Sequence, residues 1–288
     1  MRSDCSITEY ISQLNVEIPP QEEFKKIAQI FKIYPNESKE FALANYERGM
    51  LLYGLISKYK PKTILEIGRA QGYSTMCMAW ALSENKIDGK IVSVDPASLD
   101  NSIEWLIDWD DKTRIEKKST KQIWSKYAKP IWLEKIIPMT CFSDELLEKE
   151  DLPKFDFGFI DGHHIYEAVI CDFNIFLKNS NKKFHCLFDD YIDDKYTRMK
   201  QAIDELLEQY SGKIIKTNFN EKGKDIDELF MCIINNNVKN SDIKFSKEKI
   251  LKYRNIRKRW NMRQKLNGIF PPLKKLNMHK IFKKYRHS

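Results

Sequence analysis

The chain has 288 residues, of which 42% are hydrophobic and 12% aromatic, so it can bury a sizeable core and does not have the composition of a disordered protein. No run of 18 or more apolar residues occurs and the N-terminal 20 residues lack an apolar segment, so we expect neither a membrane span nor a signal peptide. The net charge of +8 is unevenly distributed, because residues 242–288 carry 16 Lys/Arg against 2 Asp/Glu whereas residues 1–241 carry 33 against 39. Only the C-terminal segment therefore suggests an anionic partner.

Helical and extended segments alternate along most of the chain. Apolar residues at helical spacing predict two N-terminal helices in residues 21–33 and 37–59, which Pro35 and Pro61 delimit. Beyond them the apolar patterns predict, in order, strand 62–68, helix 73–85, strand 90–96, strand 135–141, strand 155–161, helix 166–179, strand 184–191, helix 196–210, and strands 212–219 and 227–235. Residues 98–134 are mixed, and we expect one or two helices there, with Trp105, Trp109, Trp124 and Trp132 as packing residues.

This alternation predicts an α/β fold with a doubly wound, mostly parallel seven-stranded sheet and an antiparallel edge strand. We divide the chain into an N-terminal helical segment (1–60), a catalytic domain (61–240) and a basic C-terminal tail (241–288). The six cysteines lack CxxC spacing and mostly lie in apolar runs, so we expect reduced core residues in a cytoplasmic protein.

The segment "LEIGRAQGYST" (65–75) joins the first predicted strand to a helix, which is where a nucleotide-like ligand binds in such sheets. Gly68 and Gly72 would let the backbone approach that ligand, and Glu66 suits a cationic group better than a diphosphate. Asp95 ends the next strand and can accept hydrogen bonds from a ribose diol. Together these residues indicate S-adenosylmethionine (SAM), and the alternative is an ordinary turn with Asp95 as a helix cap. Tyr73 and Ser74 are candidates for lining the methionine end.

The stretch "ILEIGRAQGYSTMCMA" resembles motif I of the class I SAM-dependent methyltransferases. It is most similar to the small-molecule O-methyltransferases that include the caffeoyl-CoA and the sugar or macrolide types. The resemblance spans about residues 45–235 and implies a Rossmann-like methyltransferase fold. It also implies that Asp95 holds the ribose and that Ser143 contacts the adenosine.

Two clusters of acids follow predicted parallel strands, in "FIDGHHIYEAV" and "LFDDYIDDKY". Asp161 from one strand and Asp189 with Asp190 from the next can converge on one crevice. Three carboxylates are hard ligands that suit Mg²⁺, Mn²⁺ or Ca²⁺. The alternatives are a simple Asp-Gly turn and a pair of solvated acids.

The two acidic stretches resemble those of the metal-dependent sugar and macrolide O-methyltransferases. The resemblance implies that Asp161, Asp189 and Asp190 hold the metal, Mg²⁺ in our prediction, and that His164 is the base that removes the acceptor's proton. Asp161 is counted in the cofactor set as well. His163 replaces an Asp of the usual pattern, and we assign it no ligand role.

The basic tail mixes Lys/Arg with apolar residues and predicts a helix before Gly268 and a second short one after Pro271-Pro272. Such a tail suits an anionic membrane surface, a nucleic acid or an acidic protein, or it packs on the body. We favour a peripheral position at the inner face of a membrane. The function that we expect is metal-dependent O-methylation of a sugar, glycan or glycosylated metabolite, and the alternative is a nucleic-acid-binding methyltransferase that uses the tail. Acceptor identity and oligomeric state stay open.

Overall fold

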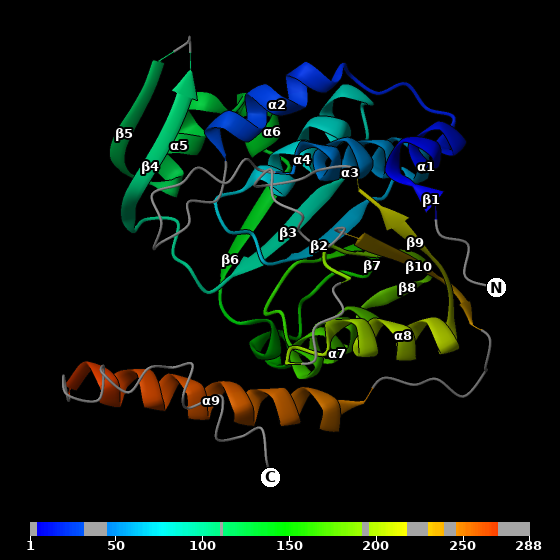
Figure 1. The fold of residues 1–288 in the computed structure, drawn as a ribbon, viewed down its shortest axis with the longest axis vertical. Coiled ribbons are helices and arrows are strands. Elements are labelled where there is room, and N and C mark those ends of the chain that lie inside the picture. Colours follow the sequence, from blue (N-terminus) through cyan, green and yellow to red (C-terminus); the bar gives the residue numbers. More distant parts are fainter. Residues whose placement is uncertain are drawn as a thin grey trace.

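The computed structural model describes residues 5–31, 45–109, 112–191, 196–217, 230–238 and 246–269 (Figure 1). Its centre is an eight-stranded sheet in the order β1-β9-β10-β8-β7-β2-β3-β6. The strands are β1 (Cys5–Ser6), β2 (Thr63–Ile67), β3 (Lys90–Asp95), β6 (Ile136–Thr140), β7 (Phe155–Ile160), β8 (Ser180–Phe188), β9 (Tyr210–Lys216) and β10 (Phe230–Val238). Strands β2, β3, β6, β7 and β8 are mutually parallel, as predicted. The predicted α/β fold class is confirmed.

The antiparallel strand differs in position from the prediction. Strand β10 runs antiparallel to both β8 and β9 and lies between them, so it is an internal strand. The two-residue strand β1 adds an eighth member at the outer edge of β9. Order along the chain does not determine which of two closing strands inserts next to the parallel core, because both orders keep the strands paired with each other.

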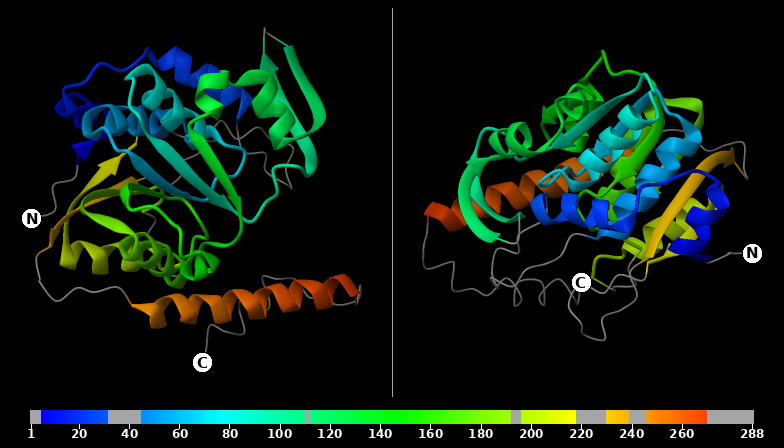
Figure 2. Two further views of the ribbon diagram at one scale, coloured as in Figure 1. Left: turned by 180° about the vertical axis from the view of Figure 1, so that it is seen from behind. Right: turned by 90° about the horizontal axis from the view of Figure 1, so that it is seen from above.

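Helices cover both faces of the sheet (Figures 1 and 2). One face carries α1 (Ile7–Leu14), α2 (Gln21–Ile30), α3 (Tyr46–Tyr59) and α4 (Tyr73–Glu84), and the opposite face carries α7 (Tyr166–Lys178) and α8 (Met199–Gln209). On the first face the rings of Phe24, Tyr53 and Trp80 pack together with centroids 5.0–5.8 Å apart. The N-terminal helices therefore share one core with the predicted catalytic domain. The predicted division into three segments stays a prediction.

The segment between β3 and β6 contains a β-hairpin that the sequence analysis did not predict. Strands β4 (Ser102–Trp109) and β5 (Lys112–Ser119) pair antiparallel, and only α5 (Thr120–Tyr127) and α6 (Pro130–Leu133) are helical. The prediction of one or two helices within residues 98–134 is confirmed by α5 and α6, whereas the hairpin before them was not predicted. Trp105 and Ile107 are buried while Ile103 is 41% exposed, and the Trp105 indole donates to the Lys118 carbonyl at 3.0 Å. Trp124 and Trp132 are buried as expected, and the Trp109 side chain lies outside the described residues.

The C-terminal helix α9 (Lys247–Ile269) is docked onto the domain beside α7 (Figure 1). Ile250 and Tyr253 are buried in the core of that face. Asp144 follows the start of the short 3₁₀ helix η1 (Ser143–Glu148), is fully buried, and accepts hydrogen bonds from the guanidinium groups of Arg254 (2.9 Å) and Arg257 (2.6 and 2.7 Å). The second helix predicted after Pro271-Pro272 lies outside the described residues. Within the described part of the chain, no helix combines the length and apolar character that a membrane crossing requires.

Candidate active site at the carboxyl ends of the parallel strands

Strand register brings the predicted site residues into one row. Ile67 of β2 pairs with Val94 of β3 and with Ile160 of β7, and Ile160 pairs with Phe188 of β8. The residues that follow these four positions are Gly68, Asp95, Asp161 and Asp189. The backbone ladder continues through them, because the N–H groups of Gly68, Asp161 and Asp189 donate to the carbonyls of Val94, Ile67 and Ile160 at 2.8–3.1 Å. The carboxyl end of the sheet thus holds both the glycine loop and the acids.

The two glycines of the loop have positive φ angles, +90° at Gly68 and +102° at Gly72, a conformation that favours glycine. A Cβ at Gly68 would lie 1.8 Å from the backbone carbonyl oxygen of Asp161, and a Cβ at Gly72 would lie 2.5 Å from the Trp124 indole. The sequence analysis attributed both glycines to the approach of a ligand. The protein's own packing already requires them, since Gly68 lies against the acidic loop and Gly72 against α5.

Glu66 is fully buried beneath the loop. One of its carboxylate oxygens, Oε2, accepts hydrogen bonds from the hydroxyls of Thr75 (2.7 Å) and Ser93. Burial raises the pKa of Glu66 to about 7, against the opposing effect of these hydrogen bonds. Its Oε1 and the side-chain oxygen of Gln71 have no hydrogen-bond partner among the described residues. Two orphaned acceptors near the loop fit a ligand with a cationic group, such as the ammonium and sulfonium of SAM.

Asp95 organises the glycine loop. Its Oδ2 accepts from the backbone N–H groups of Arg69 (3.0 Å) and Ala70 (2.9 Å), and its Oδ1 accepts from that of Ala97 (2.7 Å). A carboxylate offers about four lone-pair sites, so these three bonds leave capacity for a ribose hydroxyl. The capping alternative and the ribose role are compatible at this residue.

The other three cofactor candidates, Tyr73, Ser74 and Ser143, are buried, and two of them make side-chain hydrogen bonds within the protein. The Tyr73 hydroxyl donates to the backbone carbonyl of Tyr46 at 3.1 Å and the side chain is 3% exposed, so it packs beneath α3. Ser74 is also buried. The Ser143 hydroxyl donates to Asp172 on α7. These contacts connect the cofactor end of the sheet to its flanking helices.

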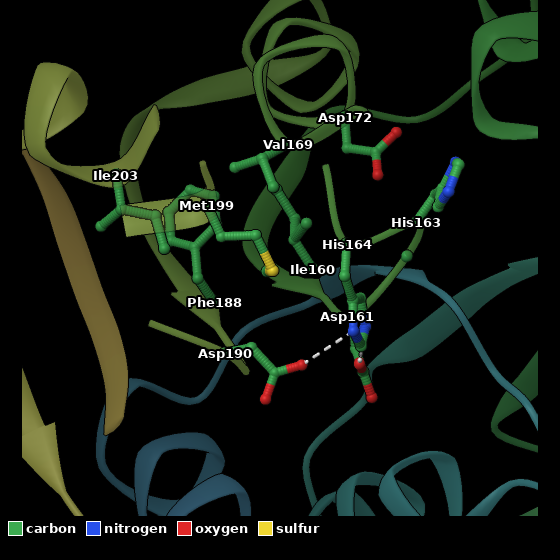
Figure 3. Close-up of a pocket in the computed structure, with 11 residues that line it drawn as sticks. Ile160, Asp161, His163, His164, Val169, Asp172, Phe188, Asp190, Met199 and Ile203 are labelled. Atoms are coloured by element: carbon green, nitrogen blue, oxygen red, sulfur yellow. Dashed lines mark hydrogen bonds and ion pairs between the residues drawn. The ribbon is translucent and has the colours of Figure 1, made fainter. Parts of the chain in front are cut away.

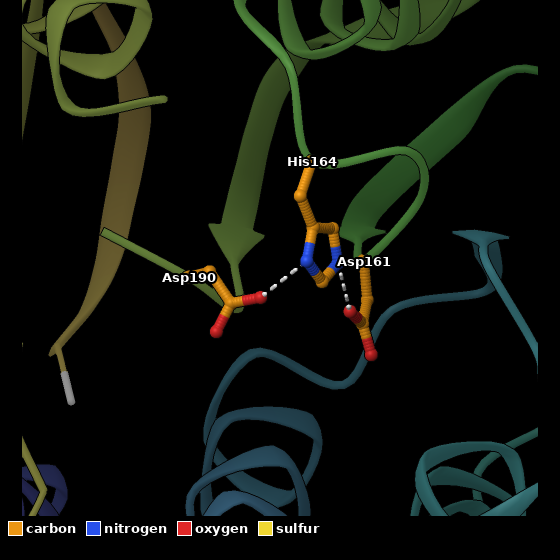
Figure 4. Close-up of side chains that lie close together, drawn as sticks. All are labelled: Asp161, His164 and Asp190. Carbon is orange, nitrogen blue, oxygen red and sulfur yellow. Dashed lines mark hydrogen bonds and ion pairs between the residues drawn. The ribbon is translucent and has the colours of Figure 1, made fainter. Parts of the chain in front are cut away.

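His164 lies between two carboxylates at the ends of adjacent strands (Figure 4). Its Nε2 is 3.4 Å from Asp161 Oδ1 and its Nδ1 is 3.2 Å from Asp190 Oδ2. The hydrogen bond with Asp161 raises the pKa of His164 to about 9; burial opposes the shift and the charge of Asp190 adds to it. The side chain is 47% exposed, so an acceptor from solvent can reach it.

Arg48, a residue that the sequence analysis missed, reaches the same cluster from the first turn of α3. Its Nη1 is 3.1 Å from Asp161 Oδ2 and also contacts Asp189 Oδ2. The signal was present in the sequence, because Arg48 occupies the same helix face as the buried Leu52 and Leu55. An arginine on the apolar face of a helix requires a buried partner.

The neighbouring His163 points away from this cluster (Figure 3). Its Nδ1 is 3.3 Å from the Tyr253 hydroxyl, and its ring lies near Trp260, so it contacts α9. Asp161, His164 and Asp190 border a small pocket of about 10 Å³, which is also lined by His163 and, on its apolar side, by Phe188 and Met199. That His163 has no ligand role stays a prediction.

The acids fit a divalent cation by the chemistry of their donor atoms. Asp161, His164 and Asp190 each offer a ligand atom, all within 4.8 Å of one another. Asp189, the other predicted ligand, comes from the same strand end as Asp190 and is held by Arg48. Carboxylate oxygens from two strand ends are the ligands that Mg²⁺ and Mn²⁺ prefer.

The central part of the chain, which contains most of this site, is similar to known proteins. Residues 65–191 match the family described as Methyltransferase domain. A relative, the uncharacterized protein R132 of Acanthamoeba polyphaga mimivirus, is 31% identical over 136 residues, which are 47% of this chain and 54% of the relative. The chain thus spans about half the length of the curated relative that it matches.

Solved structures share the fold. The O-methyltransferase from Bacillus cereus in complex with S-adenosylhomocysteine (SAH) superposes with a TM-score of 0.51 at 17% identity, covering 79% of this chain and 95% of the other. The O-methyltransferase TomG from Streptomyces achromogenes gives 0.50 at 18% identity, covering 78% and 93%. Together with the family match, this confirms the predicted resemblance to the SAM-dependent O-methyltransferases: residues 65–191 match a methyltransferase domain, and the chain shares the fold of solved O-methyltransferases.

Proposed function

We propose that the protein transfers a methyl group from SAM to a hydroxyl oxygen of a sugar, a glycan or a glycosylated metabolite. The observation that carries the proposal is the position of His164, half exposed between Asp161 and Asp190 in the row of strand ends that also holds Gly68 and Asp95. The structural neighbours described as O-methyltransferases support oxygen as the acceptor atom. The sugar class is supported by the resemblance of the two acidic stretches to the sugar and macrolide types.

The residues of the site have separate roles in methyl transfer. Glu66, Asp95 and the glycine loop bind and orient the methyl donor, which supplies an activated methyl group on its sulfonium. His164 accepts the proton of the acceptor hydroxyl. An electron pair of the hydroxyl oxygen then forms a bond to the methyl carbon, and the carbon–sulfur bond breaks to leave SAH. His164 must begin this step neutral, whereas its two carboxylate neighbours favour the protonated form.

Asp161, Asp189 and Asp190 would hold a divalent cation, Mg²⁺ in our proposal. When bound, it lowers the pKa of a coordinated hydroxyl and offsets the carboxylate charge that keeps His164 protonated. The first effect would favour loss of the hydroxyl proton, and the second would increase the fraction of His164 that is neutral when the step begins.

A screen with methyl-labelled SAM tests the function. Purified protein is incubated with a library of sugars, glycans and glycosylated metabolites, with and without Mg²⁺, and product is identified by NMR as a methyl ether. We expect label on a hydroxyl oxygen of a sugar-containing acceptor. Label on nitrogen or on RNA, or bound SAH without transfer to any hydroxyl in the library, would contradict the proposal.

We also propose that the outer face of α9 binds an anionic membrane surface. The exposed residues of this helix combine cations with large apolar side chains: Lys247, Lys249, Lys252, Lys258 and Arg259 with Leu251, Trp260 and Met262. Arg254 and Arg257 are engaged with Asp144 inside the protein, so these two cations are unavailable to a polyanion. Each exposed cation contributes about 1 kcal/mol near an anionic leaflet.

Flotation with liposomes decides this second proposal. Wild-type protein should float with phosphatidylserine vesicles and not with neutral ones. The triple variant Lys249→Glu, Lys252→Glu, Arg259→Glu should lose flotation, while the double variant Lys25→Glu, Lys26→Glu on α2, a charge reversal away from α9, should keep it. A wild-type protein that stays unbound, or that binds generic RNA with a steep salt dependence instead, would overturn it.

A further inference from the structure

We propose that Arg48 is a built-in cation of the acidic site and competes with the divalent ion for the space between Asp161 and Asp189. The inference rests on the proposed function, in which that ion takes part. It assigns Arg48 a positioning role, since the residue acts on the carboxylates and not on the reacting atoms.

Arg48 contacts both carboxylates through one nitrogen atom, as a single metal ion would. One nitrogen, Nη1, bridges Oδ2 of Asp161 and Oδ2 of Asp189. A divalent ion held by Asp161 and Asp189 would need carboxylate oxygens that Nη1 already occupies. The two cations exclude each other by both size and charge.

Burial makes a cation at this position necessary. The side chains of Arg48, Asp161 and Asp189 are only 9%, 14% and 10% exposed. Burial alone would lower the pKa of Arg48, but the charges of Asp189 and Asp161 reverse the effect and raise it above its ordinary value. Burial likewise raises the pKa of Asp189, and Arg48 counteracts this shift. Without a cation, the two carboxylates would repel each other in a poorly solvated site.

Arg48 contacts its carboxylates through fewer nitrogen atoms than Arg257 does. Arg257 binds Asp144 through two nitrogens, Nε and Nη2, with contacts of 2.6 and 2.7 Å. Arg48 uses a single nitrogen, and its Nε has no hydrogen-bond partner among the described residues. A one-point contact is easier to exchange for another cation than a bidentate one.

The consequence is a site whose carboxylates stay together before the ion arrives. Arg48 keeps Asp161 and Asp189 converged, and the incoming ion displaces its guanidinium. The metal affinity of the wild-type protein is therefore lower than the three carboxylates alone would give.

Measuring Mn²⁺ binding tests this inference without any turnover. The decrease in the EPR signal of free Mn²⁺ reports how much ion the protein has bound. Four proteins are compared: wild type, Arg48→Gln, Arg48→Lys and Arg69→Gln. Arg69 is the matched control, because it is equally buried but donates to the backbone carbonyls of Ser93 and Ala97 at 3.0 and 2.9 Å. Circular dichroism on the same samples establishes that each variant is folded, and SAH titration of the wild type reports separately on the cofactor site.

We expect Arg48→Gln to bind Mn²⁺ at least about tenfold more tightly than wild type, within the usual range for two coupled ligands. Arg48→Lys, which keeps the charge, and Arg69→Gln should stay within about threefold of wild type. Equal or weaker binding by Arg48→Gln, or no Mn²⁺ binding by any of the four proteins, would overturn the inference. Absence of SAH binding by the wild type would instead count against the proposed function, and the Mn²⁺ comparison would still stand.

Discussion

Replacing Asp144 by alanine should detach α9 from the methyltransferase domain. Asp144 is fully buried and is the common acceptor for Arg254 and Arg257, whose side chains are themselves only 14% and 8% exposed. The substitution leaves two nearly buried guanidinium groups without this partner. Removing one member of a buried ion pair costs about 3–5 kcal/mol.

This cost is measurable as a loss of stability. For a protein of this size, 3–5 kcal/mol corresponds to a decrease in Tm of roughly 6–20 °C. Urea unfolding gives the free energy of unfolding, and hydrogen exchange of the α9 amides shows whether the helix opens separately. Glu148→Ala is the matched control, because Glu148 also pairs with Arg254 (2.6 Å) but is 68% exposed and should cost less than about 1 kcal/mol. An Asp144→Ala protein with wild-type stability and wild-type exchange in α9 would refute the reasoning.

Three further predictions concern the cofactor loop and the metal. Because burial raises the pKa of Glu66 from 4.5 to about 7, the folded state binds its proton more tightly than the unfolded state, so Glu66 should make the protein less stable as pH rises from about 4.5 to 7. Glu66→Gln should remove about 3 kcal/mol of that decline in urea unfolding, and identical pH profiles of the two proteins would contradict it. Gly68→Ala places a methyl group against the Asp161 carbonyl at a positive φ, at a conformational cost of about 1–3 kcal/mol. Calorimetry should show SAH binding weakened by at least about tenfold. Unchanged affinity would show that the loop tolerates a side chain. Dialysis against EDTA should abolish methyl transfer and Mg²⁺ or Mn²⁺ should restore it, whereas a rate indifferent to chelation would exclude a catalytic ion.

Much of the site could be predicted because strand ends carry a local signal. An apolar run that ends in Gly or Asp identifies both the strand and the residue at its carboxyl end, and parallel pairing then aligns those ends without further information. This is why Gly68 and Asp95 were predicted at a cofactor site and Asp161 and Asp189 at a metal site, both at strand ends, and all four lie in one row.

What the sequence did not reveal depends on contacts between distant segments. Arg48 joins Asp189 across 141 positions, and Arg257 joins Asp144 across 113. The basic composition of the tail suggested a surface for partners, but two of its arginines belong to the interior of the fold. The hairpin β4–β5 was missed for a different reason. The alternation of Ile103, Trp105 and Ile107 is broken by the apolar Leu106, so the first strand lacks a clear period of two residues.

The assignment of His164 as the base is the central claim, and a comparison of two adjacent histidines tests it most directly. Methyl transfer to the acceptor found in the library screen is measured for wild type, His164→Ala and His163→Ala, together with their SAH affinities. We predict that His164→Ala lowers kcat by about 10²–10⁴-fold while SAH affinity stays within about twofold, and that His163→Ala, whose ring faces Tyr253, keeps most of the rate. A His164→Ala protein that turns over at the wild-type rate would contradict the assignment.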